Sequence, residues 1–317
     1  DDLQCNGKLF QNAGTLELEN IQLTTFGGFY SDGSLLRRLI LNNSLVTING
    51  DGLIINTDNL IIDKGQSEVN VLTQNTASTI KGSSTAHFHK LLFRNTNLSN
   101  SYIINIHYLL LYGSLDVDQL TLSGGFINAQ SYSTTSKIYA REIHFEGPGD
   151  KIIKQSITLK IDLLKSNSTF LNLFLETNLQ DTIHRIELRN GHCYLSGGGL
   201  KNQFMDLECS TDIIGNYTTD SLLFYPGRSY ILQAGAILTI QNHLRIRGNN
   251  CLPIQIRSSI QGTQAVITKN AGIVSGDFLE LRDINATGGA TFFAGNLSTD
   301  LGNNTGWDFL NSPNYYY

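Results

Sequence analysis

The chain has 317 residues, 22 of them basic and 27 acidic, so its formal net charge is −5 at neutral pH. The absence of a basic stripe excludes nucleic acid and anionic membrane surfaces as expected partners. Charged residues make up only 15% of the sequence, while Leu, Ile, Val and Phe recur throughout, which excludes a disordered chain.

Short segments that alternate apolar and polar residues recur along the whole chain. Such alternation is typical of half-buried β-strands. One set of these segments, most of which end in Gly, Asn or a charged residue, comprises residues 21–23, 39–43, 60–65, 91–95, 120–124, 143–147, 163–165, 186–191, 205–209, 244–248 and 279–283. A second set lies between them and comprises residues 15–18, 45–48, 103–106, 115–117, 157–161 and 237–240.

The spacing of these segments predicts a solenoid. From residue 120 to residue 209 successive units lie roughly 20 to 23 residues apart. Two or three short strands in each such period are typical of a parallel β-helix. We therefore predict an all-β, right-handed parallel β-helix of roughly a dozen turns. We expect residues 1–310 to form a single domain and residues 311–317 to form a linker into a following module.

The turns and the C-terminal end follow from the same pattern. Asn residues at the expected corners can adopt left-handed backbone conformations; they are Asn42, Asn43, Asn95 and Asn190. Near the C-terminus, the alternation over residues 278–283 predicts a strand, and the Gly-rich and Asn-rich segments after it predict turns. Trp307 and Phe309 follow these turns, and we expect them to cap the open end of the core.

The four cysteines, Cys5, Cys193, Cys209 and Cys251, follow no metal-binding or redox spacing. Cys193 and Cys209 could form a disulfide between neighbouring turns. Buried free thiols are the alternative.

Three fragments resemble pieces of the motifs of pectin-cleaving glycoside hydrolases: Asn56-Thr57-Asp58, Gly191-His192 and Arg245-Ile246-Arg247. Inverting glycosidases need two carboxyl groups about 6.5 to 9.5 Å apart. Asp58 and His192 lie many predicted turns apart, and no Asp-Asp pair occurs between them. We therefore interpret the fragments as turn residues and a solvent-facing strand, and we predict no catalytic residues.

Two sequence pairs could bind metal. Asp116 and Asp118 lie on one strand face, where a weak Ca²⁺ site is the alternative to a solvated surface. His87 and His89 have a spacing suitable for zinc, but no third ligand lies close in sequence. We predict no other cofactor.

His192 and Cys193 could suggest an activated thiolate. Neighbours in a strand point to opposite faces, however, which argues against this pair.

Tyrosines offer a possible binding surface. An exposed row of rings could stack on sugars, whereas half-buried tyrosines that pack over the core are the alternative. Our glycan-contact candidates are Tyr102, Tyr108 and Tyr112, and the same row could include Tyr132, Tyr139 and Tyr194.

The segment Ala-Thr-Gly-Gly-Ala-Thr-Phe-Phe-Ala-Gly-Asn-Leu-Ser-Thr-Asp-Leu-Gly-Asn-Asn-Thr-Gly-Trp-Asp-Phe, residues 286–309, resembles the end of a repeat in giant Bacteroidota surface proteins. These include gliding-motility adhesins of the SprB kind, which are exported by the type IX secretion system. The resemblance covers roughly residues 230–317, and residues 315–317 resemble the start of a next repeat. The opening residues Asp1-Asp2-Leu3 show neither the basic region nor the apolar region of a signal peptide, and we expect a segment of a longer or processed protein.

The resemblance implies a location at the cell surface, on the outer face of a Gram-negative outer membrane. It also implies neighbouring modules of the same chain as partners, surface glycans as possible ligands, and the secretion or motility machinery as a carrier. Thr182 and Ser221 match the Asp-Ser/Thr-apolar pattern that Bacteroidota O-glycosylate.

The leading hypothesis is a non-enzymatic, structural or adhesive β-helix module of a large secreted surface protein. A β-helix polysaccharide lyase or hydrolase and a carbohydrate-binding module are the alternatives. The sequence leaves all three open.

Overall fold

In the computed structural model the chain is a parallel β-solenoid of about 12 turns. The structure describes residues 2–73, 77–95, 107–124, 127–131, 136–147, 150–153, 157–167, 172–177 and 180–310. Within these ranges there is no helix, and therefore no helix long and apolar enough to cross a membrane. The predicted all-β parallel β-helix and its repetitive organisation are confirmed.

The solenoid divides into two compact units, Asp1–Phe174 and Leu175–Tyr317, which we call the N-terminal and C-terminal units. Each is described by itself. A single domain over residues 1–310 stays a prediction. So does the linker, since residues 311–317 lie outside the described ranges.

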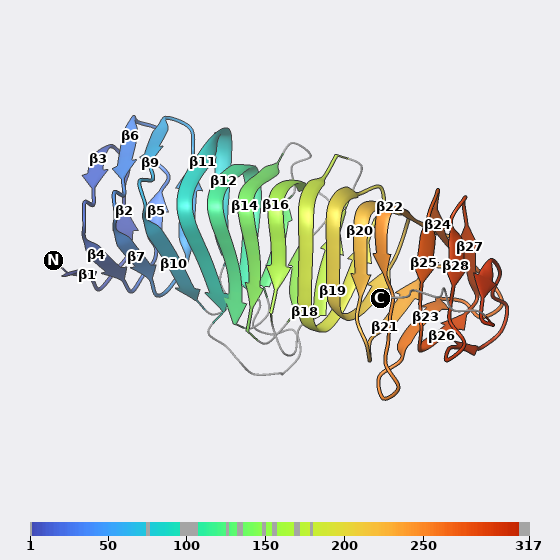
Figure 1. Cartoon of the computed structure of the whole chain (residues 1–317). Helices are drawn as coiled ribbons and strands as arrows, with labels where there is room; N and C mark the ends of the chain where they lie inside the picture. The colour runs from blue at the N-terminus through green and yellow to red at the C-terminus, as the bar shows by residue number, and fades with distance from the viewer. Residues whose placement is uncertain are drawn as a thin grey trace. The chain divides into compact units, whose positions relative to one another are not determined.

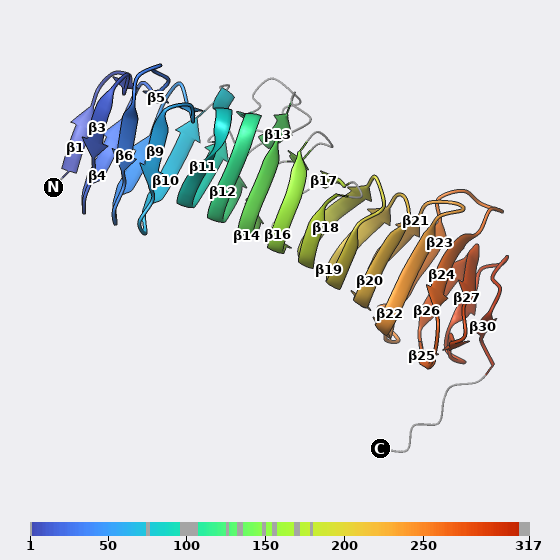
Figure 2. The same ribbon diagram turned by 90° about the horizontal axis from the view of Figure 1, so that it is seen from above.

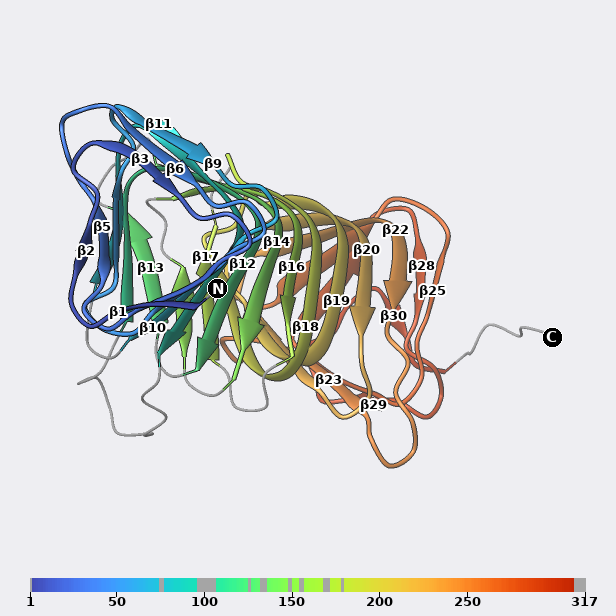
Figure 3. The same ribbon diagram turned by 90° about the vertical axis from the view of Figure 1, so that its left-hand side faces the viewer.

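The first turns of the N-terminal unit have three walls, which Figure 3 shows end-on around the N-terminus. The first wall contains β1 (Asp2–Cys5), β4 (Gln22–Thr25), β7 (Leu45–Ile48) and β10 (Glu68–Thr73). The second contains β2 (Leu9–Phe10), β5 (Phe29–Ser31) and β8 (Leu53–Asn56). The third contains β3 (Gly14–Glu17), β6 (Arg37–Ile40) and β9 (Leu60–Asp63).

Later turns of this unit use longer strands that bend from one wall into the next. β11 pairs with β8 through its first part and with β10 through its last part, so this single strand extends from the second wall to the first wall. Figure 1 shows the long strands β11, β12, β14 and β16 side by side. The strands of these turns are β11 (Ala77–Asn95), β12 (His107–Gly124), β13 (Ile127–Ser131), β14 (Lys137–Glu146), β15 (Lys151–Ile153) and β16 (Thr158–Ser166), and β17 (Asn172–Glu176) crosses the unit boundary.

The C-terminal unit repeats this plan, and Figure 2 shows β18, β19, β20 and β22 in succession. One wall continues from β19 through β20, β22, β24 and β27, and another through β21, β23, β26 and β29. β25, β28 and β30 form the third. The strands are β18 (Thr182–Ser196), β19 (Lys201–Ile213), β20 (Tyr217–Phe224), β21 (Ser229–Leu232), β22 (Ile237–Arg245), β23 (Ile254–Ser258), β24 (Ala265–Lys269), β25 (Ile273–Ser275), β26 (Leu279–Arg282), β27 (Ile284–Thr287), β28 (Thr291–Phe293), β29 (Thr299–Asp300) and β30 (Trp307–Asp308).

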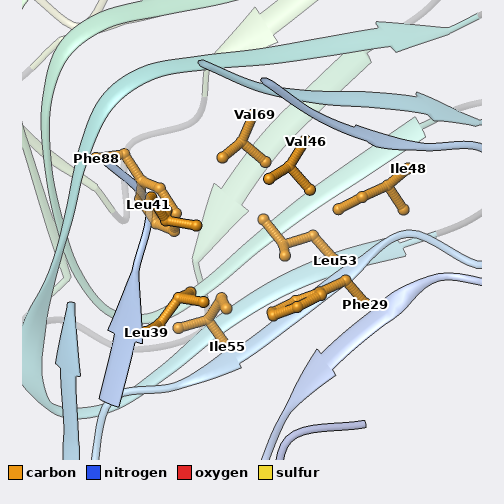
Figure 4. A pocket seen from close by; sticks show the side chains of 9 residues that line it. All are labelled: Phe29, Leu39, Leu41, Val46, Ile48, Leu53, Ile55, Val69 and Phe88. Atoms are coloured by element: carbon orange, nitrogen blue, oxygen red, sulfur yellow. The ribbon is translucent and has the colours of Figure 1, made fainter. Parts of the chain in front are cut away.

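Apolar side chains from all three walls fill the interior, because a single turn cannot bury its own apolar face. Figure 4 shows nine of them in the N-terminal unit, where they leave a void of only about 10 Å³. These residues are Phe29, Leu39, Leu41, Val46, Ile48, Leu53, Ile55, Val69 and Phe88. Each of them is at most 5% exposed, as expected for close packing between stacked strands.

Left-handed residues occur at strand ends and turns, and at a bulge inside β18. Asn43 and Asn190 have φ of 50° and 59°, which confirms the prediction for these corners, whereas Asn42 and Asn95 have no positive φ. The predicted strand over residues 278–283 is shorter than expected. Phe278 and Asp283 have φ of 52° and 58°, so β26 contains only Leu279–Arg282.

At the C-terminal end, Trp307 contacts Phe292 edge to face, with ring centroids 5.2 Å apart. β30 pairs with β28, and both Trp307 and Phe309 are half-buried. Their role as a cap stays a prediction.

Candidate functional site

The strands β11, β12, β14 and β16 all bend at the same level of the N-terminal unit. At each bend two successive residues point outward, whereas the residues on both sides of them are buried. This interrupts the usual in–out alternation of a strand. The register aligns the second residue of each pair across all four strands, namely Lys90, Gln119, Glu142 and Leu163.

The bends form a groove of about 390 Å³, here called the polar groove. Its lining residues are His89, Lys90, Asp118, Gln119, Arg141, Glu142, Asp162 and Leu163. Because neighbouring strands lie about 4.8 Å apart, the groove runs across the strands for roughly 14 Å. A recess of about 160 Å³ shares Lys90 and Gln119 with it, and Glu68 and Glu146 also line this recess. The two cavities together offer an elongated polar surface.

The carboxylate of Asp118 lies against a histidine of β11 and a lysine that directly follows β9. Its Oδ2 lies 2.7 Å from His89 Nδ1 and 3.0 Å from Lys64 Nζ. The hydrogen bond with His89 and the charge of Lys64 hold the pKa of Asp118 below its usual value. Asp118 is therefore ionised at neutral pH and is poorly suited to act as a general acid.

Replacing Asp118 by asparagine is expected to lower the free energy of unfolding at pH 7 by up to about 1 kcal/mol, the range for partly exposed ion pairs. The folded-state pKa lies below the unfolded value of about 3.9. The stabilisation is therefore present above that value and is lost as the pH falls through the folded-state pKa. Urea unfolding of Asp118→Asn and of the unaltered chain at a series of pH values tests this. Asp63→Asn on β9 is the control, and a difference that stays constant down to about pH 3 would contradict the assignment.

The two predicted metal pairs are bonded to each other. His87 Nδ1 lies 2.9 Å from Asp116 Oδ2, in the same way that His89 lies against Asp118. Both aspartates thus already have a histidine partner, which favours an ion-paired surface over a calcium or zinc site. The described residues contain no group of three His, Cys, Asp or Glu suited to a metal ion. A weak Ca²⁺ site at Asp116 and Asp118 stays a prediction.

The second carboxylate in the polar groove is also paired. Glu142 Oε1 lies 2.7 Å from Lys165 Nζ and accepts a hydrogen bond of 3.0 Å from Gln119 Nε2. In the neighbouring recess, His144 Nδ1 lies 2.9 Å from Glu146 Oε1. Glu142 is therefore held by side chains of the two neighbouring strands, whereas Glu146 is held by a histidine of its own strand.

Tyr139 places an aromatic ring beside the polar groove. It lies on β14 two residues before Arg141, on the same strand face, and is 38% exposed. Among the predicted glycan contacts, Tyr112 is 44% exposed on β12. Tyr102 and the side chain of Tyr108 lie outside the described residues, as does Tyr132. Tyr194 is half-buried, with its ring centroid 4.7 Å from that of His192.

The fragments that resemble glycosidase motifs have separate structural roles. Asp58 Oδ1 accepts hydrogen bonds from the amide (2.8 Å) and hydroxyl (2.7 Å) of Ser83, which lower the pKa of Asp58. His192 belongs to the other unit, where its Nε2 lies 3.0 Å from Asp212 Oδ1. Arg245 and Arg247 are exposed on either side of the buried Ile246, as expected for a solvent-facing strand.

The four cysteines form no disulfide bond in the structure. All four thiols are free, and Cys193 and Cys209 are buried, so the disulfide alternative is wrong. Burial raises the pKa of both of these thiols, that of Cys209 to about 11, which makes Cys193 a poor nucleophile beside His192.

The two predicted O-glycosylation sites have little exposed surface. Thr182 is half-buried and Ser221 is 8% exposed. O-glycosylation of either residue stays a prediction.

A second charged cluster lies in the C-terminal unit. Arg189 donates to both carboxylate oxygens of Asp206, at 2.8 and 2.6 Å, and lies 3.1 Å from Glu208. Tyr225 lies between the guanidinium groups of Arg189 and Arg245, 5.8 and 5.7 Å from its ring centroid. Here the carboxylates compensate Arg189.

The polar groove was not predicted, although its histidines and aspartates were singled out. The missed signal is their common spacing: His87 to Asp116 and His89 to Asp118 are both 29 residues apart. Equal offsets between complementary residues indicate one turn of a solenoid, so the pairs could have been matched. Nothing in the sequence indicates that the strands bend at the same level.

A scan against protein-family models and searches of curated proteins and of solved structures each found no match for this chain.

Proposed function

We propose that the chain is a non-enzymatic, adhesive β-solenoid module that binds an extended glycan along the polar groove. The observation that carries the proposal is the groove itself, which crosses β11, β12, β14 and β16 and continues into the recess at Lys90 and Gln119. An elongated, open polar surface suits a chain-like hydrophilic ligand better than an enclosed small molecule. The exposed ring of Tyr139 adds an apolar surface for a sugar ring.

The state of the carboxylates supports binding over catalysis. Acid–base hydrolysis of a glycosidic bond needs one carboxyl group held protonated and a second one across the cleaved bond. In the polar groove Asp118 and Glu142 are each paired with cations, and the pKa of Asp118 is lowered rather than raised. A lyase or hydrolase remains the alternative.

The setting of this activity is also part of the proposal. The resemblance of residues 286–309 to adhesin repeats supports secretion through the type IX system and display at the cell surface. A stack of parallel strands bonded across every turn is suited to hold a binding face away from its attachment point.

Binding of the full chain to a glycan array, with product analysis of every hit, tests the proposal. We expect binding without turnover, and the same binding with and without calcium. Tyr139→Ala should weaken binding to the best glycan by about fivefold, because stacking on an exposed aromatic ring contributes on the order of 1 kcal/mol. Tyr112→Ala is the matched control.

Three outcomes would count against the proposal. Release of shortened sugars would support the lyase or hydrolase alternative. A loss with Tyr112→Ala but not with Tyr139→Ala would move the contact from the polar groove to Tyr112. No binding to any glycan would leave a structural spacer.

A further inference from the structure

We propose that the polar groove selects acidic glycans, and that Arg141 is the residue that recognises their carboxylate or sulfate groups. This inference rests on the proposed glycan binding and adds the chemical class of the ligand. It follows from which charges in the groove are already compensated and which are not.

The groove's acidic side chains are engaged within the protein. Asp118 is shared by His89 and Lys64, and Glu142 is bonded to Lys165. Asp162, the third carboxylate, also has an interaction partner. A ligand therefore meets two carboxylates, those of Asp118 and Glu142, whose charge is offset by fixed lysine neighbours.

Two cationic side chains of the groove are not engaged with other described side chains in this way. Lys90 and Arg141 are exposed, and the structure records no ion pair or side-chain hydrogen bond for either of them with any described residue. They come from β11 and β14, so they mark two separate levels of the groove. The groove therefore holds two cations that form no ion pair with a described residue, although the chain as a whole is acidic.

The two cations have different surroundings. Lys90 also lines the recess, where it lies opposite Glu68 in the register of β10 and β11. Glu68 accepts a hydrogen bond of 3.0 Å from the side-chain amide of Asn70 and forms no ion pair with a described residue. The negative charge of Glu68 in the recess therefore disfavours the binding of an anionic ligand near Lys90. Arg141 does not line the recess, so an acidic group is expected to bind at Arg141.

The chemistry of Arg141 fits this role. A guanidinium group presents planar, paired donors that match a carboxylate or sulfate in a bidentate arrangement. The ring of Tyr139 lies on the same face of β14, two residues away. One acidic sugar could thus place its ring against Tyr139 and its charged group against Arg141.

Two ligands of equal length that differ only in charge test the inference: an oligogalacturonate and its fully methyl-esterified form. Calorimetry with the full chain at low salt should give at least tenfold tighter binding of the acid form. Arg141→Gln should weaken binding of the acid form by about tenfold or more, the scale of one hydrogen-bonded charge pair. The same variant should leave binding of the ester unchanged.

Arg257→Gln is the control, because Arg257 is also an exposed strand arginine but lies on β23 of the other unit. Arg141→Lys keeps the charge without the paired donors and should retain part of the selectivity. The thermal unfolding temperature of each variant should be unchanged, since none of these side chains is buried.

The outcomes separate this inference from the proposed function. Equal affinity for acid and ester, weakened to the same degree by Tyr139→Ala, would overturn charge selection but leave glycan binding intact. The chain could bind the acid form selectively while neither Arg141→Gln nor Arg257→Gln changes that binding. This result would place the site elsewhere and overturn the role of Arg141. If neither ligand binds and no glycan on the array binds, both proposals fail.

Discussion

Replacing Arg37 by alanine is expected to lower the free energy of unfolding by about 3 kcal/mol or more, because each buried polar group left without a partner costs about 1–3 kcal/mol. Arg37 lies on β6 and has no exposed surface. Its side chain donates to Ser31 Oγ and to the carbonyl oxygens of Asn56 and Asp58, at 2.9, 2.9 and 2.5 Å. Burial lowers the pKa of its guanidinium group.

The network around Arg37 connects successive turns. Ser31 Oγ donates to Gln11 Oε1 at 3.0 Å, and Gln11 Nε2 donates to the carbonyl of Arg38 at 2.8 Å. Side chains and carbonyls from three consecutive turns therefore depend on one guanidinium group. Its removal would leave their buried groups unsatisfied together.

Chemical unfolding followed by circular dichroism measures this loss, and hydrogen exchange should show it first in β3, β6 and β9. Arg38→Ala is the matched control, since Arg38 is the next residue on the same strand and is exposed. We expect it to change stability by less than about 0.5 kcal/mol. Equal effects of the two substitutions would contradict the structural role of Arg37.

Replacing Gly197 by alanine is expected to be the second strongly destabilising change. Gly197 has φ of 100°, and an added Cβ would overlap the carbonyl oxygen of Thr177 on the neighbouring turn. Thr177 is 1% exposed and donates its hydroxyl to the carbonyl of Ser196 at 3.1 Å, so it has little room to move. The substitution therefore combines backbone strain with overpacking.

Gly235→Ala separates these two costs. Gly235 also has a left-handed φ, 75°, but no atom lies within 4 Å of the position that a Cβ would take. Its substitution should cost about 1–2 kcal/mol, the strain of a left-handed residue with a side chain. Gly197→Ala should exceed it by about 1–3 kcal/mol, the scale of overpacking. Thermal unfolding of both variants tests this, and an equal loss would show that close packing at Gly197 contributes nothing.

The sequence by itself determined the fold class. Alternation with a period of two identifies strands, and a unit length near 20 residues forces each strand to pair with its equivalent on the next turn. Segments such as residues 45–48 and 237–240 were predicted as strands and are β7 and β22. The face of each residue follows from the same alternation. Arg245 and Arg247 were predicted to face solvent, and both are exposed, with Ile246 buried between them.

The exact ends of the strands were harder to predict from the sequence. Phe278 and Asp283 fit the alternation of β26 but take left-handed conformations at its two ends. This depends on how the preceding and following turns must connect. Local propensity does not contain that information, because a bulky residue at positive φ is unfavourable by itself and is maintained only by its surroundings.

The candidate site was decided by the tertiary structure. In the sequence, His89 and Asp118 belonged to two separate candidate metal-binding pairs, and no role was predicted for Lys64, Arg141 or Glu142. They become one surface only because strands 21 to 29 residues apart are stacked in a fixed register and bend at the same level. A groove, and the charge left uncompensated in it, arises from contacts between turns, and such contacts depend on register and loop length rather than on the composition of any one strand.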